Sequence, residues 1–308
     1  MAYVNVLLGF IILVFSGEYL VRGGVCLAKD LKISKLVIGI TIVAFGTSAP
    51  ELSVSAIAAF KGHAEIAIGN VIGSNIANIA LVLAVTAIIF PISVNRQAIK
   101  LDWLIMMGAS GLLYFFISDS VLDLTEGLIF ISLLLTYLIF SIRASRKVYV
   151  AGEEEEKFDY PMWLALLLVV FASIGLAFGS TLLIDGASEI ALKLGVSERV
   201  ASITLIAFGT SLPELTTSMT AAFRKESEIS IGNIIGSNIF NILGVLGISS
   251  IISDIQIAQL TRTFDIFWML AISMLLLLVA LFLREGKTRR SQGFILFVLY
   301  CLYIYLLF

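Results

Sequence analysis

Two segments of the sequence place a proline and a glutamate inside long apolar stretches. Residues 43–52 read VAFGTSAPEL, and residues 206–215 read IAFGTSLPEL. Proline disrupts a helix, and a carboxylate in hydrocarbon costs at least about 3 kcal/mol. Because both segments contain these two unfavourable residues in the same pattern, we expect the residues to have a chemical role. Their carboxylates, hydroxyls and freed main-chain carbonyls supply oxygen atoms, the ligand type that Ca²⁺ prefers.

In the first segment, three polar side chains share one face if the segment is helical. Thr47 lies four residues before Glu51 and Ser48 lies three before it, so all three can point the same way. Pro50 lacks an N–H and clashes with the carbonyl four residues back, which predicts a kinked or unwound helix near 44–47. Irregular backbone at membrane depth is tolerated only where protein buries it or where it lines a cavity. The second segment repeats the arrangement with Phe208, Thr210, Ser211, Pro213 and Glu214.

A polar stripe is expected on the helix that follows each segment. GNVIGSNIANI at 69–79 and GNIIGSNIFNI at 232–242 are identical at nine of eleven positions. In both, polar residues recur every four positions and share one helix face: Asn70, Ser74 and Asn78, and Asn233, Ser237 and Asn241. We interpret Asn78 and Asn241 as site-lining, because they should lie nearer the membrane midplane. Asn70 and Asn233 fit either the site or hydrogen bonding between helices.

Composition fixes the class of protein. Of the 308 residues, 59% are hydrophobic and 14% are charged, against about 25% charged in a soluble domain. This favours an all-α polytopic membrane protein, because a span needs about 20 mostly apolar residues. We predict ten transmembrane helices, at 3–26, 36–60, 64–90, 101–118, 124–142, 161–184, 197–223, 227–252, 264–283 and 292–308.

The two halves of the chain repeat each other. A shift of 163 residues superimposes Glu51 on Glu214 and Asn78 on Asn241, and the alignment runs without a gap from about residue 23 to 83. Two five-helix repeats follow, at 1–142 and 161–308, joined by a cytoplasmic linker at 143–160, with the paired motifs inside 36–90 and 197–252. Since five is odd, the second repeat should be inverted. Inverted repeats are typical of secondary transporters, whose sites lie near the midplane at the repeat interface.

The distribution of basic residues predicts an orientation. Segments after the odd-numbered spans hold 16 of the 20 Lys and Arg residues. By the positive-inside rule these segments are cytoplasmic and both termini are extracellular. We therefore expect a multi-pass protein of the cell membrane. Glu18 and Asp185, late in spans 1 and 6, are interpreted as gate or interface residues rather than cation ligands.

Charge balance narrows the ligand of the two glutamates. If both ionise, the site carries a charge of about −2, which one Ca²⁺ or two Na⁺ would cancel. Binding of either Ca²⁺ or Na⁺ offsets the cost of burying the ionised carboxylates. Ca²⁺ and Na⁺ should therefore compete for this site, and this competition allows exchange. With more than two Na⁺ per Ca²⁺, each cycle would move net charge and respond to voltage. Ca²⁺ and Na⁺ are expected as substrates, with no resident cofactor, no nucleic acid and no obligatory protein partner.

At these paired motifs, FGTSxPEL and GNxIGSNIxNI, the chain resembles the Ca²⁺/cation antiporter superfamily, and most closely its prokaryotic Na⁺/Ca²⁺ exchanger branch. The resemblance covers the whole chain and implies exchange by alternating access, with spans 1 and 6 moving against the other eight. Beyond the glutamates and Asn78 and Asn241, it implies a central site from the side chains of Thr47, Ser48, Thr210, Ser211, Ser74 and Ser237 and the carbonyls of Ala44 and Ala207.

The resemblance also bears on the counter-ion. Several members carry an aspartate where this chain has Asn241, and an acid near there is associated with K⁺ use, so K⁺ cotransport is not expected. The Ca²⁺/H⁺ branch often reads GNxxE in place of GTSxPE, which favours Na⁺ over H⁺. Three alternatives remain open: a Ca²⁺/H⁺ antiporter on the same fold, a passive cation channel, and a membrane hydrolase. The last is disfavoured because no His or Lys base lies near Ser48 and Glu51.

Overall fold

The computed structural model describes residues 1–93, 96–149, 160–194, 209–281 and 286–307. The first half of the chain is helical apart from a two-residue strand, and some of its helical segments are short π-helical (η1, η2) or 3₁₀ (η3) turns. In order, its elements are α1 (Ala2–Leu31), α2 (Lys35–Ile38), η1 (Gly39–Val43), α3 (Ala44–Thr47), α4 (Ala49–Phe60), α5 (Glu65–Ala77), η2 (Asn78–Leu83), α6 (Ala84–Ile89), α7 (Arg96–Phe116), η3 (Ile117–Asp119), β1 (Val121–Leu122) and α8 (Leu124–Val148).

The second half has a similar order, with π-helical turns at η4 and η5. Its described elements are α9 (Met162–Lys193), α11 (Leu212–Phe223), α12 (Ser227–Ile239), η4 (Phe240–Leu246), α13 (Gly247–Ile252), β2 (Ile255–Gln256), η5 (Thr261–Asp265), α14 (Ile266–Leu281) and α15 (Arg290–Leu307). The strands β1 and β2 form a short antiparallel pair, with Val121 opposite Gln256 and Leu122 opposite Ile255. This pair joins the loop after α7 to the loop after α13.

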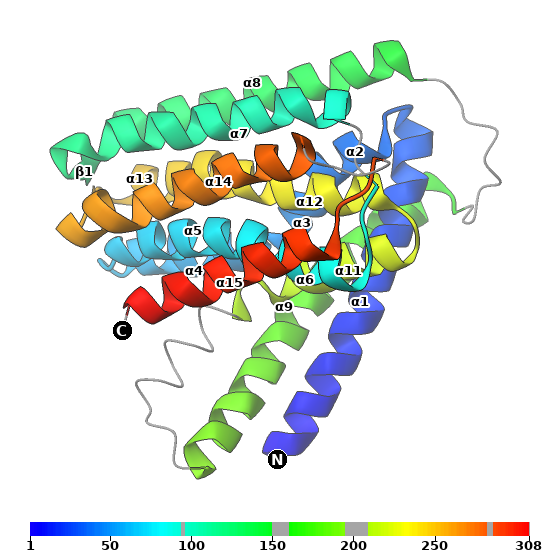
Figure 1. The fold of residues 1–308 in the computed structure, drawn as a ribbon, viewed down its shortest axis with the longest axis horizontal. Helices are drawn as coiled ribbons and strands as arrows, with labels where there is room; N and C mark the ends of the chain where they lie inside the picture. Colours follow the sequence, from blue (N-terminus) through cyan, green and yellow to red (C-terminus); the bar gives the residue numbers. More distant parts are fainter. Residues whose placement is uncertain (94–95, 150–159, 195–208, 282–285, 308) are drawn as a thin grey trace.

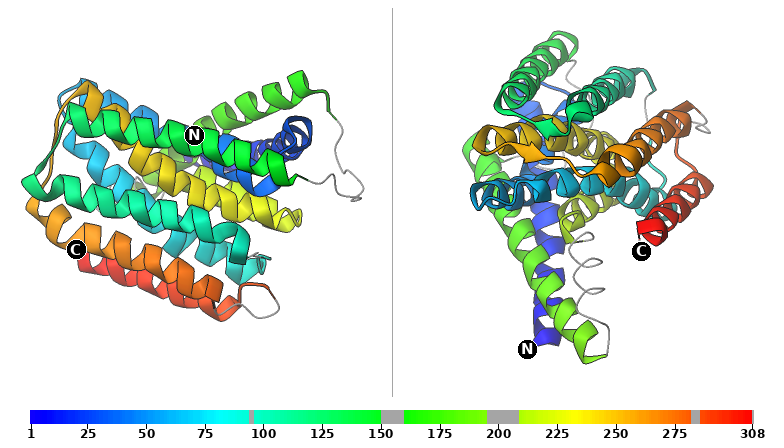
Figure 2. Two further views of the ribbon diagram at one scale, coloured as in Figure 1. Left: turned by 90° about the horizontal axis from the view of Figure 1, so that it is seen from above. Right: turned by 90° about the vertical axis from the view of Figure 1, so that its left-hand side faces the viewer.

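Most of the helices run roughly side by side in a stack, whereas α1 and α9 cross it steeply and project from it together (Figures 1 and 2). These two helices pack mainly against each other. Small residues allow the approach: a Cβ at Gly9 would lie 2.7 Å from the Gly179 carbonyl, and a Cβ at Gly186 would lie 2.7 Å from that of Ala2. Close packing through glycine is common between membrane helices. The structure therefore has two parts, a helix pair and a stack.

Eight helices of the described residues are long and apolar enough to cross a membrane, and α2–α3 with α4 form a further bent span. This confirms an all-helical, multi-pass membrane protein. The part of the predicted span 197–223 that precedes Gly209 lies outside the described residues, and its remainder contains α11. Three helices are longer than predicted: α1 continues to Leu31, α8 to Val148 and α9 to Lys193. Hydropathy misplaced these ends because a helix can continue with polar residues beyond the apolar core.

The polar-rich spans lie at the centre of the molecule. In the most apolar window of Glu65–Ile89, 78% of residues are buried, and in that of Ser227–Ile252, 89% are buried, while the other long helices reach at most 39%. Helices with Asn, Ser and Gly on several faces are unsuited to lipid, because each unpaired polar group there costs several kcal/mol. Their burial brings the paired motifs together in the interior.

Candidate functional site

The first motif forms a break between two helices. The axes of Lys35–Thr47 and Ala49–Phe60 differ by 47°, and Ser48 at the junction has φ −85° and ψ 5°. Pro50 lies in the first turn of α4, where a missing N–H breaks no helical bond. The break is thus one residue beyond the predicted window of 44–47, because proline is accommodated by starting a new helix rather than by distorting the preceding one.

The second motif has the same local geometry where it is described. Ser211 has φ −87° and ψ 1°, and Pro213 lies in the first turn of α11. Ala207, implied as a carbonyl ligand, and Phe208 lie outside the described residues. The two segments therefore present Ser and Glu at matching positions of matching helix starts. Each glutamate is in the first turn of its helix, where backbone N–H groups favour negative charge.

Both glutamate side chains are completely buried, at 0% exposure. Ser48 Oγ donates to Glu214 Oε1 at 3.2 Å, so the first motif reaches the second glutamate. Ser237 Oγ lies 3.5 Å from the same oxygen. Among the described residues, Glu214 Oε2 and both carboxylate oxygens of Glu51 have no hydrogen-bond partner. Three buried carboxylate oxygens are therefore left for another electropositive group.

Hydroxyl groups from both motifs face the partner helices. Thr47 Oγ1 donates to Asn233 Oδ1 at 3.0 Å and lies 3.3 Å from Ser237 Oγ. At the equivalent position, Ser74 Oγ lies 3.5 Å from Thr210 Oγ1. Each contact joins the break of one half to the polar stripe of the other. The hydroxyl of Ser211 is buried and has no partner in the described part of the chain.

One implied ligand already accepts a hydrogen bond in this structure. The Ala44 carbonyl accepts the backbone N–H of Ser48 at 2.9 Å. Thr47 Oγ1 also lies 3.2 Å from this carbonyl, but its single proton has Asn233 Oδ1 within 3.0 Å as a second acceptor. A carbonyl oxygen has two lone pairs, so Ala44 has one lone pair for a cation whenever Thr47 donates to Asn233.

Asn70 and Asn233 brace each motif against the helix that follows it. Asn70 Nδ2 donates to the Glu51 carbonyl at 3.3 Å and to Ser55 Oγ at 2.9 Å. Asn233 Nδ2 makes the equivalent bonds, to the Glu214 carbonyl at 3.5 Å and to Ser218 Oγ at 3.1 Å. The sequence motifs did not single out the two serines. The available signal was their position four residues after each glutamate, on the same helix face.

Asn78 and Asn241 are buried at 0% exposure and each binds across to the other half. Asn78 Nδ2 donates to Asn238 Oδ1, and Asn241 Nδ2 donates to Asn75 Oδ1, both at 3.1 Å. The side-chain oxygens of Asn78 and Asn241 have no hydrogen-bond partner among the described residues. Apart from Ala207, which is not described, predicted site residues of both halves thus lie in one buried region, and several of its oxygens have no partner among the described residues.

The electrostatic balance of this region is negative if both glutamates are ionised. Within the described residues no group of three or more His, Cys, Asp or Glu side chains gathers, so no third carboxylate joins the pair. The ion pairs of the described residues involve other carboxylates, such as Glu18 with Arg22 and Glu226 with Lys35. The donor set fits a hard cation that prefers oxygen ligands.

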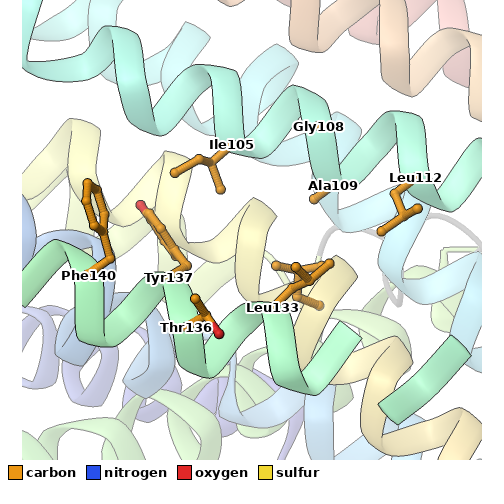
Figure 3. Close-up of a pocket in the computed structure, with 9 residues that line it drawn as sticks. Ile105, Gly108, Ala109, Leu112, Leu133, Thr136, Tyr137 and Phe140 are labelled. Carbon is orange, nitrogen blue, oxygen red and sulfur yellow. The ribbon is translucent and has the colours of Figure 1, made fainter. Parts of the chain in front are cut away.

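A pocket of about 360 Å³ lies elsewhere, between α7 and α8 (Figure 3). Apart from Thr136 and Tyr137 its lining is apolar, and neither glutamate is part of it. The Tyr137 hydroxyl is already committed, since it donates to Asp102 Oδ1 at 2.8 Å. This lining offers no oxygen set comparable with that of the paired motifs.

Comparison with known proteins agrees with this geometry. A family model described as "Sodium/calcium exchanger protein" matches residues 1–143 and 164–308. Sodium/calcium exchanger MaX1 of Methanosarcina acetivorans is 30% identical over 99% of this chain and 98% of its own length. Inner membrane protein YrbG of Escherichia coli is 30% identical over 94% of this chain and 91% of its own. The solved sodium/calcium exchanger from Methanococcus jannaschii is similar in fold, with a TM-score of 0.81 and 33% identity over 98% of this chain and 96% of that one.

Proposed function

Because the chain belongs to the sodium/calcium exchanger protein family, we propose that it exchanges Ca²⁺ for Na⁺ across a membrane. The similar proteins from Methanosarcina acetivorans and Methanococcus jannaschii are named exchangers, and this chain is a transporter rather than an enzyme. It is a multi-pass membrane protein and belongs to the superfamily of antiporters that transport Ca²⁺ and other cations. The direction and the driving ion are the finer parts of the proposal.

One observation carries the proposal: two fully buried glutamates with three unpaired carboxylate oxygens between them, in the described part of the chain. Burying an ionised carboxylate is costly unless a charge or metal compensates it. One Ca²⁺ or two Na⁺ would supply equal compensation. The two cargos then occupy the same carboxylates by turns, which is the physical basis of exchange.

We infer that the cation site comprises the twelve residues of the paired motifs. They are Glu51, Glu214, Thr47, Ser48, Thr210, Ser211, Ala44, Ala207, Ser74, Ser237, Asn78 and Asn241. Hydroxyl and amide oxygens bind Na⁺ without adding protein charge, which allows more than two Na⁺ per Ca²⁺ and an electrogenic cycle. The neutral Asn241 gives no third carboxylate, and this favours exchange without K⁺.

The proposed architecture is ten spans in two inverted five-helix repeats, at 1–142 and 161–308, with both termini outside. Equivalent hydrogen bonds recur at the offset of 163 residues, as for Asn70 with Ser55 and Asn233 with Ser218, and support this division. In the proposed cycle α1 and α9 move together against the stack. An ion pair of Glu18 on α1 with Arg224 at the end of α11, whose Nε lies 2.9 Å from Glu18 Oε2, would hold the pair in this conformation.

The proposal is tested by ⁴⁵Ca²⁺ uptake into proteoliposomes that hold the purified protein, with imposed Na⁺ gradients at fixed pH. Uptake should require Na⁺ on the opposite side, reverse when the gradient reverses and increase with a membrane potential that favours net charge movement. Empty liposomes and liposomes with Glu51→Gln protein provide matched controls.

The alternatives give different results in the same assay. Ca²⁺ flux that ignores Na⁺ and follows a pH gradient would identify a Ca²⁺/H⁺ antiporter and overturn the proposed counter-ion. Flux that needs no counter-ion would identify a passive channel. Voltage-insensitive exchange would leave Na⁺/Ca²⁺ antiport standing but contradict an electrogenic cycle.

A further inference from the structure

Two buried hydrogen-bond chains cross the centre of the molecule. In the first, Asn75 Nδ2 donates to the Asn238 carbonyl at 3.3 Å and faces Met269 Sδ at 3.7 Å, while Asn75 Oδ1 accepts from Asn241 Nδ2 at 3.1 Å. In the second, Asn238 Nδ2 faces Met106 Sδ at 3.6 Å, and Asn238 Oδ1 accepts from Asn78 Nδ2 at 3.1 Å. The side chains of the two chains correspond at an offset of 163 residues: Asn75 with Asn238, Asn78 with Asn241, and Met106 with Met269.

Each hydrogen-bond chain starts at groups that can only accept, and these groups fix which way its amides are turned. They are the Asn238 carbonyl and Met269 Sδ in the first chain and Met106 Sδ in the second. A backbone carbonyl and a thioether sulfur accept hydrogen bonds but cannot donate them. Asn75 must therefore turn its NH₂ group toward the Asn238 carbonyl and Met269, which leaves its oxygen facing Asn241. An oxygen facing Asn241 requires a donor, so Asn241 presents Nδ2 there. The oxygen of Asn241 then points away from the chain, and the same logic applied from Met106 directs the oxygen of Asn78.

Each hydrogen-bond chain ends on an amide oxygen for which the described part of the protein offers no donor. Asn78 Oδ1 and Asn241 Oδ1 are buried and have no hydrogen-bond partner among the described residues. The helices loosen at the same points, since the π-helical turn η2 begins at Asn78 and η4 begins one residue before Asn241. Single π-helical turns inside helices are frequent at functional sites. Buried polar atoms without a partner are rare in folded proteins and call for a ligand or a strain.

We propose that Asn75 and Asn238 are positioning residues that hold the amides of Asn241 and Asn78 with their oxygens, not their NH₂ groups, toward the transported cation. The inference rests on the proposed function and deepens it, because it assigns how two neutral ligands keep the orientation that a cation needs. An amide turned the other way would place two N–H donors against the cation. Asn75 and Asn238 act through their partners and do not touch the ion.

The test is a pair of double-mutant cycles measured by equilibrium binding of ⁴⁵Ca²⁺, with Na⁺ competition, to purified full-length protein. Partners in a ligand's outer shell typically change affinity by roughly 10- to 100-fold, so Asn75→Leu should weaken Ca²⁺ binding about tenfold. Since Asn75 acts through Asn241, adding Asn75→Leu to Asn241→Ala should weaken binding by less than about twofold more, because coupled residues are not additive. The crossed combination, Asn75→Leu with Asn78→Ala, should multiply the two single effects.

The second cycle, Asn238→Leu with Asn78→Ala, should show the same coupling and serves if the first Leu variant does not fold. Thr86→Val is the matched control: Thr86 is buried just beyond η2, and its hydroxyl donates to the Val82 carbonyl rather than to a site residue, so the change should leave both affinities unchanged. Multiplicative effects within each proposed pair, or equal coupling in the crossed pair, would overturn the inference. If wild-type protein bound neither Ca²⁺ nor Na⁺, the proposed function itself would fail instead.

Discussion

Glu51 and Glu214 occupy equivalent positions in the two halves, yet their surroundings differ. Glu214 accepts hydrogen bonds from Ser48 and Ser237, whereas both oxygens of Glu51 have no partner among the described residues. The difference extends to the serines: Ser48 is bonded to the opposite glutamate, while Ser211, its equivalent, is not. Equivalent sequence therefore does not produce equivalent hydrogen bonding in one conformation. On the proposed function, we expect the first-half carboxylate to depend more on a bound cation than the second.

We expect the largest effect on transport when the charge of either glutamate is removed. Glu51→Gln and Glu214→Gln should each reduce Na⁺-driven ⁴⁵Ca²⁺ uptake to the background of empty liposomes, because one remaining carboxylate cannot balance a divalent ion. Gel filtration should show that both variants are inserted and folded. Near-normal uptake in either variant would contradict the site.

Stability in ion-free buffer separates the two glutamates. An unsatisfied buried polar group costs about 1–3 kcal/mol, and an ionised one costs more; a Gln side chain is still polar but lacks the charge. Glu51→Gln should therefore raise the thermal midpoint by roughly 2–6 °C, and Glu214→Gln should raise it less because hydrogen bonds already support that carboxylate. Added Ca²⁺ should stabilise the wild-type protein but neither variant. Equal shifts of the thermal midpoint in the two variants would contradict the proposed difference between Glu51 and Glu214.

A negative charge introduced at position 241 tests whether the neutral Asn241 sets the cation preference of the site. Asn241→Asp adds a third carboxylate, and ligand charge tunes Ca²⁺ affinity strongly, so the affinity ratio of Ca²⁺ to Na⁺ should rise about tenfold. An ionised carboxylate cannot donate to Asn75 Oδ1, so some stability should be lost as well. Competition binding measures the ratio, with Asn241→Ser as the uncharged control. A changed yield with an unchanged ratio would argue against a ligand role.

We expect the smallest effects from substitution of the two equivalent serines, Ser48 and Ser211. Ser48→Ala removes a buried hydrogen bond and should lower the free energy of unfolding by about 1 kcal/mol. Ser211→Ala removes a buried hydroxyl that has no partner among the described residues and should leave the free energy of unfolding unchanged or raise it slightly. Both should weaken Ca²⁺ binding several-fold if both hydroxyls are ligands. Thermal melts and binding isotherms on the same preparations decide this. A larger stability loss from Ser211→Ala would reverse the proposed asymmetry.

Much of the site followed from particular residues of the sequence. Pro50 and Glu51, repeated as Pro213 and Glu214, marked a buried break with a carboxylate, and the offset of 163 residues indicated which segments meet. The offset could not foresee the difference between Glu51 and Glu214, since a repeat describes both halves alike. Nor did it indicate the π-helical turns at Asn78 and Asn241, because a repeat offset shows which residues correspond and not which hydrogen-bond register their helices adopt.

The pairing of Asn75 with Asn241 was also not foreseen. The four-residue spacing placed Asn70, Ser74 and Asn78 on one face and left Asn75 off it. Only the contact between the two central helices shows that Asn75 reaches the opposite stripe. The long continuations of α1 and α9 were missed for a different reason, since hydropathy reports where the apolar core ends and not where a helix ends.

The most direct test of the central claim is a crystal structure of the protein grown with Ca²⁺, examined for the position of the ion. We predict one Ca²⁺ between Glu51 and Glu214, with oxygens of both carboxylates at about 2.3–2.6 Å from it. Carboxylates that lie far apart or face lipid, with no ion between them, would contradict it.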